Sequence, residues 1–236
     1  MISTILNILG SLGIFLFGMK VMSEGIQKTA GSRLRNILAY MTQNRFAGVF
    51  TGFLATCLVQ SSSATTVMVV SFVNAGLLTL TQSVGVIMGA NIGTTITGWM
   101  IAILGFKFKI TAIALPSVGI GLPLIFSKST KRKNIGEIFV GFGMLFLGLN
   151  FLKSSVPDIK NNPEVLEFLA SYTDLGLLST LIFIIVGVIL TITVQSSSAA
   201  MTITITMAFK GWIDFPTAAA LVLGENIGTT ITAYLA

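Results

Sequence analysis

From Phe46 to Phe106 the chain runs for 61 residues without one Asp, Glu, Lys or Arg. A helix of about 20 predominantly apolar residues crosses the hydrocarbon core of a bilayer, so such a run is typical of membrane-embedded helices. Of all 236 residues 9% are charged, whereas soluble domains carry about 25%, and the mean hydropathy is +0.92. We therefore expect an all-α, multi-pass integral protein of the cytoplasmic membrane, with the lipid bilayer as its main solvent.

The residues that usually carry covalent chemistry are scarce. The chain has no histidine, which is the commonest general base and metal ligand, and Cys57 is its single cysteine. One thiol forms neither a disulfide within the chain nor a transition-metal site, and no nucleophile has a base beside it. We predict no enzyme, no cofactor and no transition metal. The net charge of +6 is expected to reflect basic cytoplasmic loops rather than nucleic-acid binding.

Charged residues indicate where the chain leaves the bilayer. Lys20–Arg45 is predicted to lie on the membrane surface as a polar amphipathic segment, and Val156–Asp174 is polar and acidic. Five membrane crossings are expected, the last of them incomplete: Met1–Met19, Gln82–Leu104, Ile110–Phe126, Glu137–Lys153 and Phe215–Ala236.

Two identical polar motifs interrupt the long apolar runs, since Gln60–Ser63 and Gln195–Ser198 both read Gln-Ser-Ser-Ser. As a helix, the 14 apolar residues of Phe46–Val59 span about 21 Å, which is short of a hydrocarbon core of about 30 Å. Ala64–Leu77, after the motif, is equally short. Two half-length helices around a polar tip predict a re-entrant hairpin, whose backbone is tolerated at membrane depth where protein or a water-filled cavity satisfies it.

The motifs belong to a longer internal repeat. Residues 60–97 and 195–232 align without a gap at an offset of 135, with fourteen identities, and both end in Asn-Ile-Gly-Thr-Thr-Ile-Thr. A weaker similarity joins Gly13–Gly18 to Gly143–Gly148. Three crossings, an odd number, separate the first helix from its counterpart. The two repeats are therefore predicted to have inverted topology, which is a common plan of secondary transporters.

These observations predict a first repeat at residues 1–127, a cytoplasmic loop at 128–134 and a second, inverted repeat at 135–236. Each repeat is expected to contain a re-entrant helical hairpin and a broken transmembrane helix. Loop charge supports this orientation, because Lys20–Arg45 and Lys128–Lys133 hold 9 of the 14 basic residues, which marks the cytoplasmic side. Five of the 8 acids fall on the opposite side: Asp158, Glu164, Glu167, Asp174 and Asp214.

The Gln-Ser-Ser-Ser motifs offer neutral hydrogen-bonding groups for an anion. A helix is expected to begin just after each motif, and the free N–H groups of a helix N-terminus form a ready anion site. Such hydroxyls often bond only to their own helix, but two copies at a fixed offset favour a binding role. Two tips that face each other near the membrane midplane are predicted to bind a small tetrahedral oxyanion. The predicted ligands are Gln60, Ser61, Ser62, Ser63, Gln195, Ser196, Ser197 and Ser198.

Neither motif has a Lys or Arg nearby, so bound cations have to balance the charge of the anion. The hard oxygens of the Asn-Ile-Gly-Thr-Thr blocks suit sodium, and Gly93 and Gly228 are expected to break the helix and free backbone carbonyls. Glu225 stands where the first repeat has Ala90, and a carboxylate at membrane depth is a functional candidate. The predicted sodium ligands are Asn91, Thr94, Thr95, Glu225, Asn226, Thr229 and Thr230.

At these residues the chain resembles the sodium/phosphate cotransporter family of the type II class. The resemblance is specific at Gln60–Ala64, Gly89–Thr97, Gln195–Ala199 and Gly224–Thr232. It implies that the two Gln-Ser-Ser-Ser segments and their partner blocks form sites for inorganic phosphate and for sodium, which acts as co-substrate. The expected function is sodium-coupled symport of inorganic phosphate across the cytoplasmic membrane by alternating access.

Two alternatives stay open at this point. One alternative is a secondary transporter of another small oxyanion or carboxylate. The other is a non-transporting membrane anchor with a degenerate site. The second repeat also lacks a counterpart of Ile110–Phe126, so that it is incomplete at its C-terminus. Three explanations account for this: a fragment, a truncated gene, or a half that is completed in a homo-oligomer.

Overall fold

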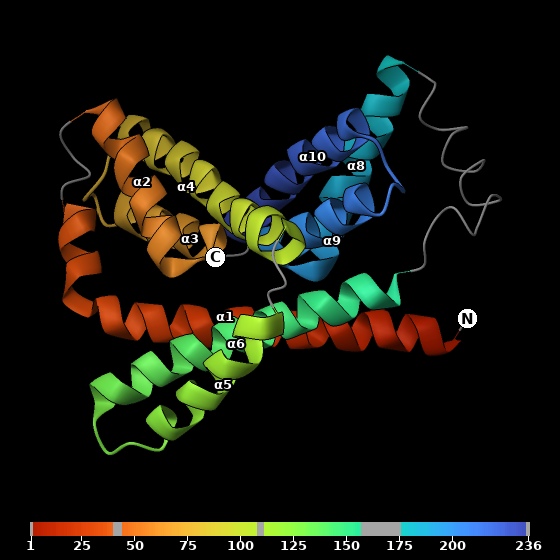
Figure 1. The fold of residues 1–236 in the computed structure, drawn as a ribbon. Coiled ribbons are helices and arrows are strands. Elements are labelled where there is room, and N and C mark those ends of the chain that lie inside the picture. Colours follow the sequence, from red (N-terminus) through yellow and green to blue (C-terminus); the bar gives the residue numbers. More distant parts are fainter. Residues whose placement is uncertain (1, 40–43, 108–110, 157–175, 235–236) are drawn as a thin grey trace. The chain divides into compact units, whose positions relative to one another are not determined.

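The computed structural model describes residues 2–39, 44–107, 111–156 and 176–234, and the described chain is helical apart from short turns. It forms two compact units, Met1–Ser155 and Val156–Ala236 (Figure 1). The first unit contains α1 (Ile2–Ala39), α2 (Arg45–Val59), α3 (Ser62–Asn74), α4 (Leu80–Met100), the π-helical segment η2 (Ile101–Lys107), α5 (Thr111–Ile125) and α6 (Thr130–Ser155). The second contains α8 (Leu177–Val194), α9 (Ser197–Phe209) and α10 (Phe215–Tyr234). The all-helical prediction is confirmed for the described residues.

The distribution of side chains differs from that in a water-soluble protein, because large apolar side chains are exposed and many hydroxyl groups are buried. Ile185, with 58% of its surface exposed, is one of many large apolar side chains on the outside, whereas Thr202 is fully buried. Helix interfaces within membranes are enriched in small and hydroxyl-bearing residues, because lipid tails are as apolar as leucine. This pattern fits helices that are solvated by lipid.

Four described stretches are long and apolar enough to cross a membrane: Ile2–Ala30, Leu80–Phe106, Thr130–Ser155 and Leu177–Val194. The first three correspond to predicted crossings. The fourth, α8, was predicted as one arm of a hairpin, yet its 18 residues span about 27 Å. The helices beside the first motif are as short as predicted, with 15 residues in α2 and 13 in α3.

Two helices extend beyond the predicted boundaries. α1 continues from the predicted first crossing into the predicted surface segment Lys20–Arg45, as far as Ala39. Within the predicted cytoplasmic loop 128–134, the residues from Thr130 onward belong to α6. Charged side chains do not end these helices, since Lys28 of α1 donates to Glu137 of α6 with 2.8 Å between Nζ and Oε2. The acidic stretch 157–174 lies outside the described residues.

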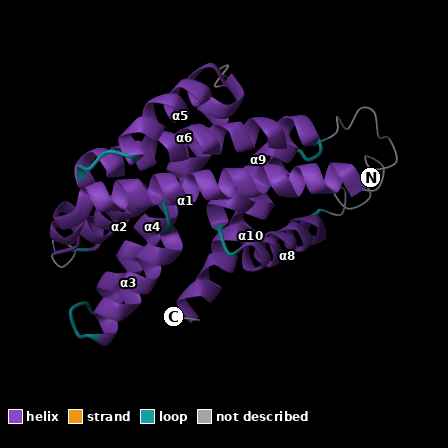
Figure 2. Cartoon of the chain, turned by 90° about the horizontal axis from the view of Figure 1, so that it is seen from below, coloured by secondary structure: helices purple, strands orange, loops and turns teal. Residues whose placement is uncertain are grey.

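The long helices α1 and α6 pack against each other in antiparallel directions (Figure 1). α6 lies between α1 and α5 (Figure 2). A Cβ atom on Gly148 would clash with the backbone of Phe15, and one on Gly18 would clash with the backbone of Leu145. These are the same contact with the partners exchanged, because Phe15 and Gly18 align with Leu145 and Gly148 at the offset of 130. The two related helices therefore meet through a self-complementary, two-fold-like contact.

A second glycine contact occurs once in each unit. A Cβ atom on Gly89 would clash with the carbonyl of Val49, and one on Gly224 would clash with the carbonyl of Ile184. Ile184 and Gly224 lie 135 positions after Val49 and Gly89, so α8 packs on α10 in the same way as α2 packs on α4. The two copies of the sequence repeat thus share one local mode of helix packing.

Beyond Met100 the helix widens into the π-helical segment η2. Lys153 of α6 donates to the carbonyl of Gly105, with 2.7 Å between Nζ and O, and lies 4.4 Å from the centre of the Phe106 ring. A π-helical turn changes the backbone hydrogen-bond partners, and here a lysine from a neighbouring helix satisfies one carbonyl.

Candidate functional site

The first Gln-Ser-Ser-Ser motif forms a tight corner between α2 and α3. Gln60 has left-handed backbone angles, φ 55° and ψ 25°, and its N–H donates to the carbonyl of Thr56 at 2.6 Å. Its side-chain Nε2 donates to the carbonyl of Cys57 at 2.7 Å. Glycine usually takes this position after a helix, so a glutamine here indicates that its side chain matters.

The first serine of the motif begins the next helix. Ser61 is extended, with φ −148° and ψ 107°, and its Oγ accepts a hydrogen bond from the N–H of Ala64 at 3.1 Å. Serine is among the best residues at this position, because its oxygen satisfies one of the free N–H groups at the helix start. Ser62 is buried and Ser63 is half-buried on the first turn of α3.

The second motif repeats this geometry closely. Gln195 has φ 57° and ψ 23°, its N–H donates to the carbonyl of Thr191 at 2.8 Å, and its Nε2 donates to the carbonyl of Ile192 at 2.7 Å. Ser196 has φ −153° and ψ 110° and accepts from the N–H of Ala199 at 3.3 Å. Among the described residues only the two motif glutamines are non-glycine residues with positive φ. Ser197 and Ser198 are buried on the first turn of α9.

Two variants of Gln195 distinguish the energetic cost of its left-handed backbone from the loss of its side chain. Gln195→Gly and Gln195→Ala both remove the carboxamide, but only alanine is strained at positive φ. We expect the alanine variant to be about 1 kcal/mol less stable than the glycine variant. Thermal unfolding in detergent measures this difference. Equal stability of the two variants would contradict the left-handed corner.

The Asn-Ile-Gly-Thr-Thr blocks lie inside continuous helices, so the predicted helix break at Gly93 and Gly228 is wrong. α4 runs unbroken through the first block and α10 through the second. Instead, the two glycines give room to a threonine of the neighbouring helix. A Cβ on Gly93 would lie 2.8 Å from Cβ of Thr56, and one on Gly228 would lie 2.8 Å from Cβ of Thr191.

The threonines of these blocks bond to their own helices. Thr94 donates to the carbonyl of Ala90 at 3.2 Å and Thr229 to that of Glu225 at 2.9 Å, and both threonines are buried. Thr95 and Thr230 are exposed within their units and donate to carbonyls three residues earlier, at 2.6 and 2.7 Å. A hydroxyl that donates its proton keeps its oxygen lone pairs, so Thr95 and Thr230 can each offer an oxygen to a cation. Asn91 and Asn226 are half-buried on the same helices.

Two contacts tie the first motif to helices that are distant in sequence. Thr97, at the end of the first block, donates to Oε1 of Gln60 at 3.1 Å. Ser23 and Gln27 of α1 both donate to the carbonyl of Val59, the latter at 3.2 Å from Nε2. That carbonyl lies directly before the motif at a helix end, where partners within the helix are missing. Ser23 and Gln27 were not predicted, and their spacing of four residues is the only signal for them in the sequence.

Glu225 is the most deeply buried charged residue that the structure describes, with 1% of its surface exposed. Its Oε1 accepts a hydrogen bond from Oγ1 of Thr204 on α9 at 2.7 Å, whereas its Oε2 has no partner. Thr204 is a further residue that sequence analysis missed. The two motifs lie in different units, so the expectation that their tips face each other stays a prediction.

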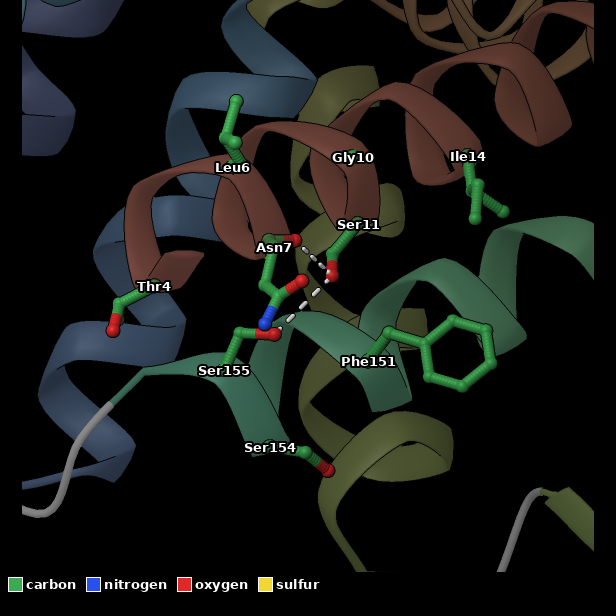
Figure 3. A pocket seen from close by; sticks show the side chains of 9 residues that line it. All are labelled: Thr4, Leu6, Asn7, Gly10, Ser11, Ile14, Phe151, Ser154 and Ser155. Carbon is green, nitrogen blue, oxygen red and sulfur yellow. Dashed lines mark hydrogen bonds between the residues drawn. The ribbon is translucent and has the colours of Figure 1, made fainter. Parts of the chain in front are cut away.

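A hollow of about 650 Å³ lies in the first unit, between the start of α1 and the end of α6 (Figure 3). Ser11 donates to the carbonyl of Asn7 at 2.6 Å there and lies 3.5 Å from the hydroxyl of Ser155. None of the predicted phosphate or sodium ligands lines this hollow, so it is not the predicted site.

The chain is similar to known proteins over nearly its whole length. The Na+/Pi-cotransporter family model matches residues 14–154 and 165–236. YjbB of Escherichia coli O157:H7, named as a candidate inorganic phosphate export protein, is 32% identical over 98% of this chain and 41% of its own length. The uncharacterized protein YqeW of Bacillus subtilis (strain 168) is 32% identical over 94% of this chain and 69% of its own length.

A more distant relative comes from an animal. The sodium-dependent phosphate transport protein 2A of Rattus norvegicus is 38% identical over 41% of this chain and 15% of its own length. The chain thus spans about two fifths of the length of YjbB and less of the rat protein. No solved structure matches the chain significantly.

Proposed function

The chain belongs to the Na+/Pi-cotransporter family, and we propose that it moves inorganic phosphate together with sodium ions across the cell membrane by alternating access. The family is one of transporters rather than enzymes, and the apolar helices make the chain an integral membrane protein. Sodium coupling is supported by the name of the rat relative, and phosphate as cargo by the names of both the rat and the E. coli relatives.

The observation that carries this proposal is the pair of matching motif corners. In each corner a left-handed glutamine and an extended serine start a new helix, α3 in one unit and α9 in the other. A helix N-terminus carries about half a positive charge from its free N–H groups and attracts phosphate groups. Two such starts, each with at least one buried serine on its first turn, supply hydrogen-bond donors for an oxyanion, and neither includes a fixed cation.

Cations then have to supply the missing positive charge. Phe46–Phe106 and Leu175–Phe209, the two runs that contain the motifs, hold no Lys or Arg. In a medium of low dielectric an unbalanced anion is very costly, so binding of phosphate and sodium together is favoured over either alone. The block threonines, the two asparagines and Glu225 provide hard oxygen ligands for the sodium ions.

Alternating access needs two structural halves that exchange their roles. The antiparallel, two-fold-like contact between α1 and α6 supports inverted repeats, because the two related helices then enter the membrane from opposite sides. In such transporters one repeat rocks against the other around a site near the midplane. The short helices α2 and α3, with a polar tip between them, support a re-entrant hairpin in the first repeat.

The experiment is the flux of radiolabelled phosphate in liposomes that contain the purified chain. With sodium outside and none inside, we expect uptake that rises at least tenfold over the flux without a sodium gradient. Preloaded liposomes with the opposite gradient test movement in the outward direction, which the name of YjbB indicates for that relative. Phosphate flux that is the same with and without sodium would refute the proposal.

Competitors in the same assay identify the cargo. Arsenate resembles phosphate in shape and charge and is expected to compete, whereas sulfate and succinate at the same concentration are not. Inhibition by succinate but not by arsenate would indicate a carboxylate transporter. The absence of any flux from well-folded, reconstituted protein would instead favour a membrane anchor.

A further inference from the structure

The second repeat contains buried oxygen atoms that the first repeat lacks. At three positions of the alignment the second repeat differs in a way that adds or frees an oxygen. Val69 is replaced by Thr204, Ala90 by Glu225, and Thr65 by Ala200. The two residues of the first repeat that lack a polar group, Val69 and Ala90, are buried with at most 1% of their surface exposed. The site of the second repeat is therefore polar where that of the first is apolar.

The third replacement frees a hydroxyl. In the first repeat Thr56 donates to Oγ1 of Thr65 at 3.1 Å. The counterpart of Thr56 is Thr191, and its partner would be Ala200, which has no hydroxyl. Oγ1 of Thr191 is accordingly buried without a hydrogen bond, with 3% of the residue exposed. Thr191 and Glu225 Oε2 thus present two unpartnered oxygens in one three-helix unit.

The residues that carry these two oxygens meet α10 within about one helical turn of each other. Thr191 of α8 packs against Gly228. Gly228 follows Glu225 by three residues, and residues three apart share one face of a helix. Thr204 of α9 fixes the carboxylate from the other side through Oε1, which leaves Oε2 free. Three helices therefore contribute buried oxygen-bearing side chains to one region of the unit.

A carboxylate in this place needs a positive charge. Lys210 is the single basic residue among residues 176–234, and no ion pair to Glu225 occurs among the described residues. A proton on Oε2 would find no acceptor there, and a proton on Oε1, which could be donated to Thr204, would still leave Oε2 unpartnered. A bound cation satisfies the charge and the unpartnered oxygens together.

We propose that Glu225, Thr191 and Thr204 form a sodium site that belongs to the second repeat alone. Glu225 Oε2 and Thr191 Oγ1 are its ligands, and Thr204 holds the carboxylate in place. The first repeat has no equivalent, since Ala90 and Val69 stand at the matching positions. That the ion is sodium rests on the proposed function. Thr191 and Thr204 lie outside both the Gln-Ser-Ser-Ser motif and the Asn-Ile-Gly-Thr-Thr block of the second repeat.

The test is equilibrium binding of radioactive sodium to the purified full chain in detergent, without phosphate and with N-methylglucamine as the balancing cation. Glu225→Gln is expected to bind one sodium ion fewer per chain than the unchanged protein. Thr204→Val keeps the carboxylate but loses its positioning bond, so we expect the same number of ions with one bound about tenfold more weakly. Thr191→Val is expected to weaken the same ion.

The matched control is Thr56→Val, the same change at the equivalent position of the first repeat, which should leave sodium binding unchanged. Glu225→Gln that binds as many ions as the unchanged protein, with the same affinity, would overturn the site. If this variant does not fold, unaltered binding by folded Thr204→Val and Thr191→Val overturns it equally. Either result leaves sodium-driven phosphate flux standing, whereas flux that ignores sodium would refute the proposed function itself.

Discussion

Ser61→Asp and Ser196→Asp are each expected to abolish sodium-driven phosphate flux, by a factor of 100 or more, while the protein stays folded. Aspartate is as good as serine at the first position of a helix, so the hydrogen bond to the N–H three residues later is kept. The new charge, however, occupies the place proposed for phosphate. Two like charges 4 Å apart repel by about 4 kcal/mol at an effective dielectric constant of 20, which lowers affinity nearly a thousandfold.

Asn44→Asp is the control for this pair of variants. Asn44 starts α2 in the same way, with its Oδ1 accepting from the N–H of Ala47 at 2.7 Å, but it lies at the far end of α2 from the motif. We expect its phosphate flux to stay within twofold of the unchanged protein. Flux near the normal level in Ser61→Asp or Ser196→Asp, together with normal unfolding temperatures, would exclude these helix starts as the phosphate site.

Gly89→Ala and Gly224→Ala are expected to lower the free energy of unfolding by about 3 kcal/mol or more. The added methyl group would meet backbone atoms of the neighbouring helix, the carbonyl of Val49 in one case and that of Ile184 in the other. Backbone cannot turn aside as a flexible side chain can, so the helices have to separate. Thermal unfolding in detergent, followed by circular dichroism, measures the loss.

Gly119→Ala is the matched control for the glycine variants. A Cβ atom on Gly119, in α5, would meet nothing within 4 Å. Alanine forms helix better than glycine by about 1 kcal/mol, so this variant is expected to be as stable as the unchanged protein or more so. If Gly224→Ala were equally stable, the close packing of α8 on α10 would be wrong.

Local chemistry made the helix starts predictable from sequence. Serine favours the start of a helix, and the apolar runs beside Gln60–Ser63 are too short for a full crossing, so the corner between α2 and α3 followed from residue types alone. The internal repeat likewise predicted that the second motif would adopt the same form. Glutamine has no preference for the left-handed region, and the angles of Gln60 and Gln195 could therefore not be predicted.

The features that could not be predicted depend on contacts between helices that are distant in the sequence. A glycine within a helix can either break the helix or make room for a neighbouring helix, and the sequence alone does not distinguish these roles. Gly93 and Gly228 have the second role, because each lies against a threonine of a neighbouring helix. Thr204 reaches Glu225 across 21 residues of sequence, and Ser23 reaches Val59 across 36. No local pattern encodes such distances. The helix of the first crossing continues past Met19, because a charged residue such as Lys28 can stay helical when a neighbouring helix offers a carboxylate.

The convergence of the two motif corners on one phosphate is tested most directly by cross-linking. Cys57 is the single cysteine of the chain, so Cys57→Ala gives a background for the pair Ser61→Cys and Ser196→Cys. The control pair is Ser71→Cys with Ser196→Cys, because Ser71 lies about 15 Å further along α3. With a short bifunctional thiol reagent in membranes, we predict rapid cross-linking within one chain for the first pair, slowed by phosphate plus sodium, and little for the control. Cross-linking of the first pair no faster than that of the control, or unaffected by phosphate, would contradict a shared site.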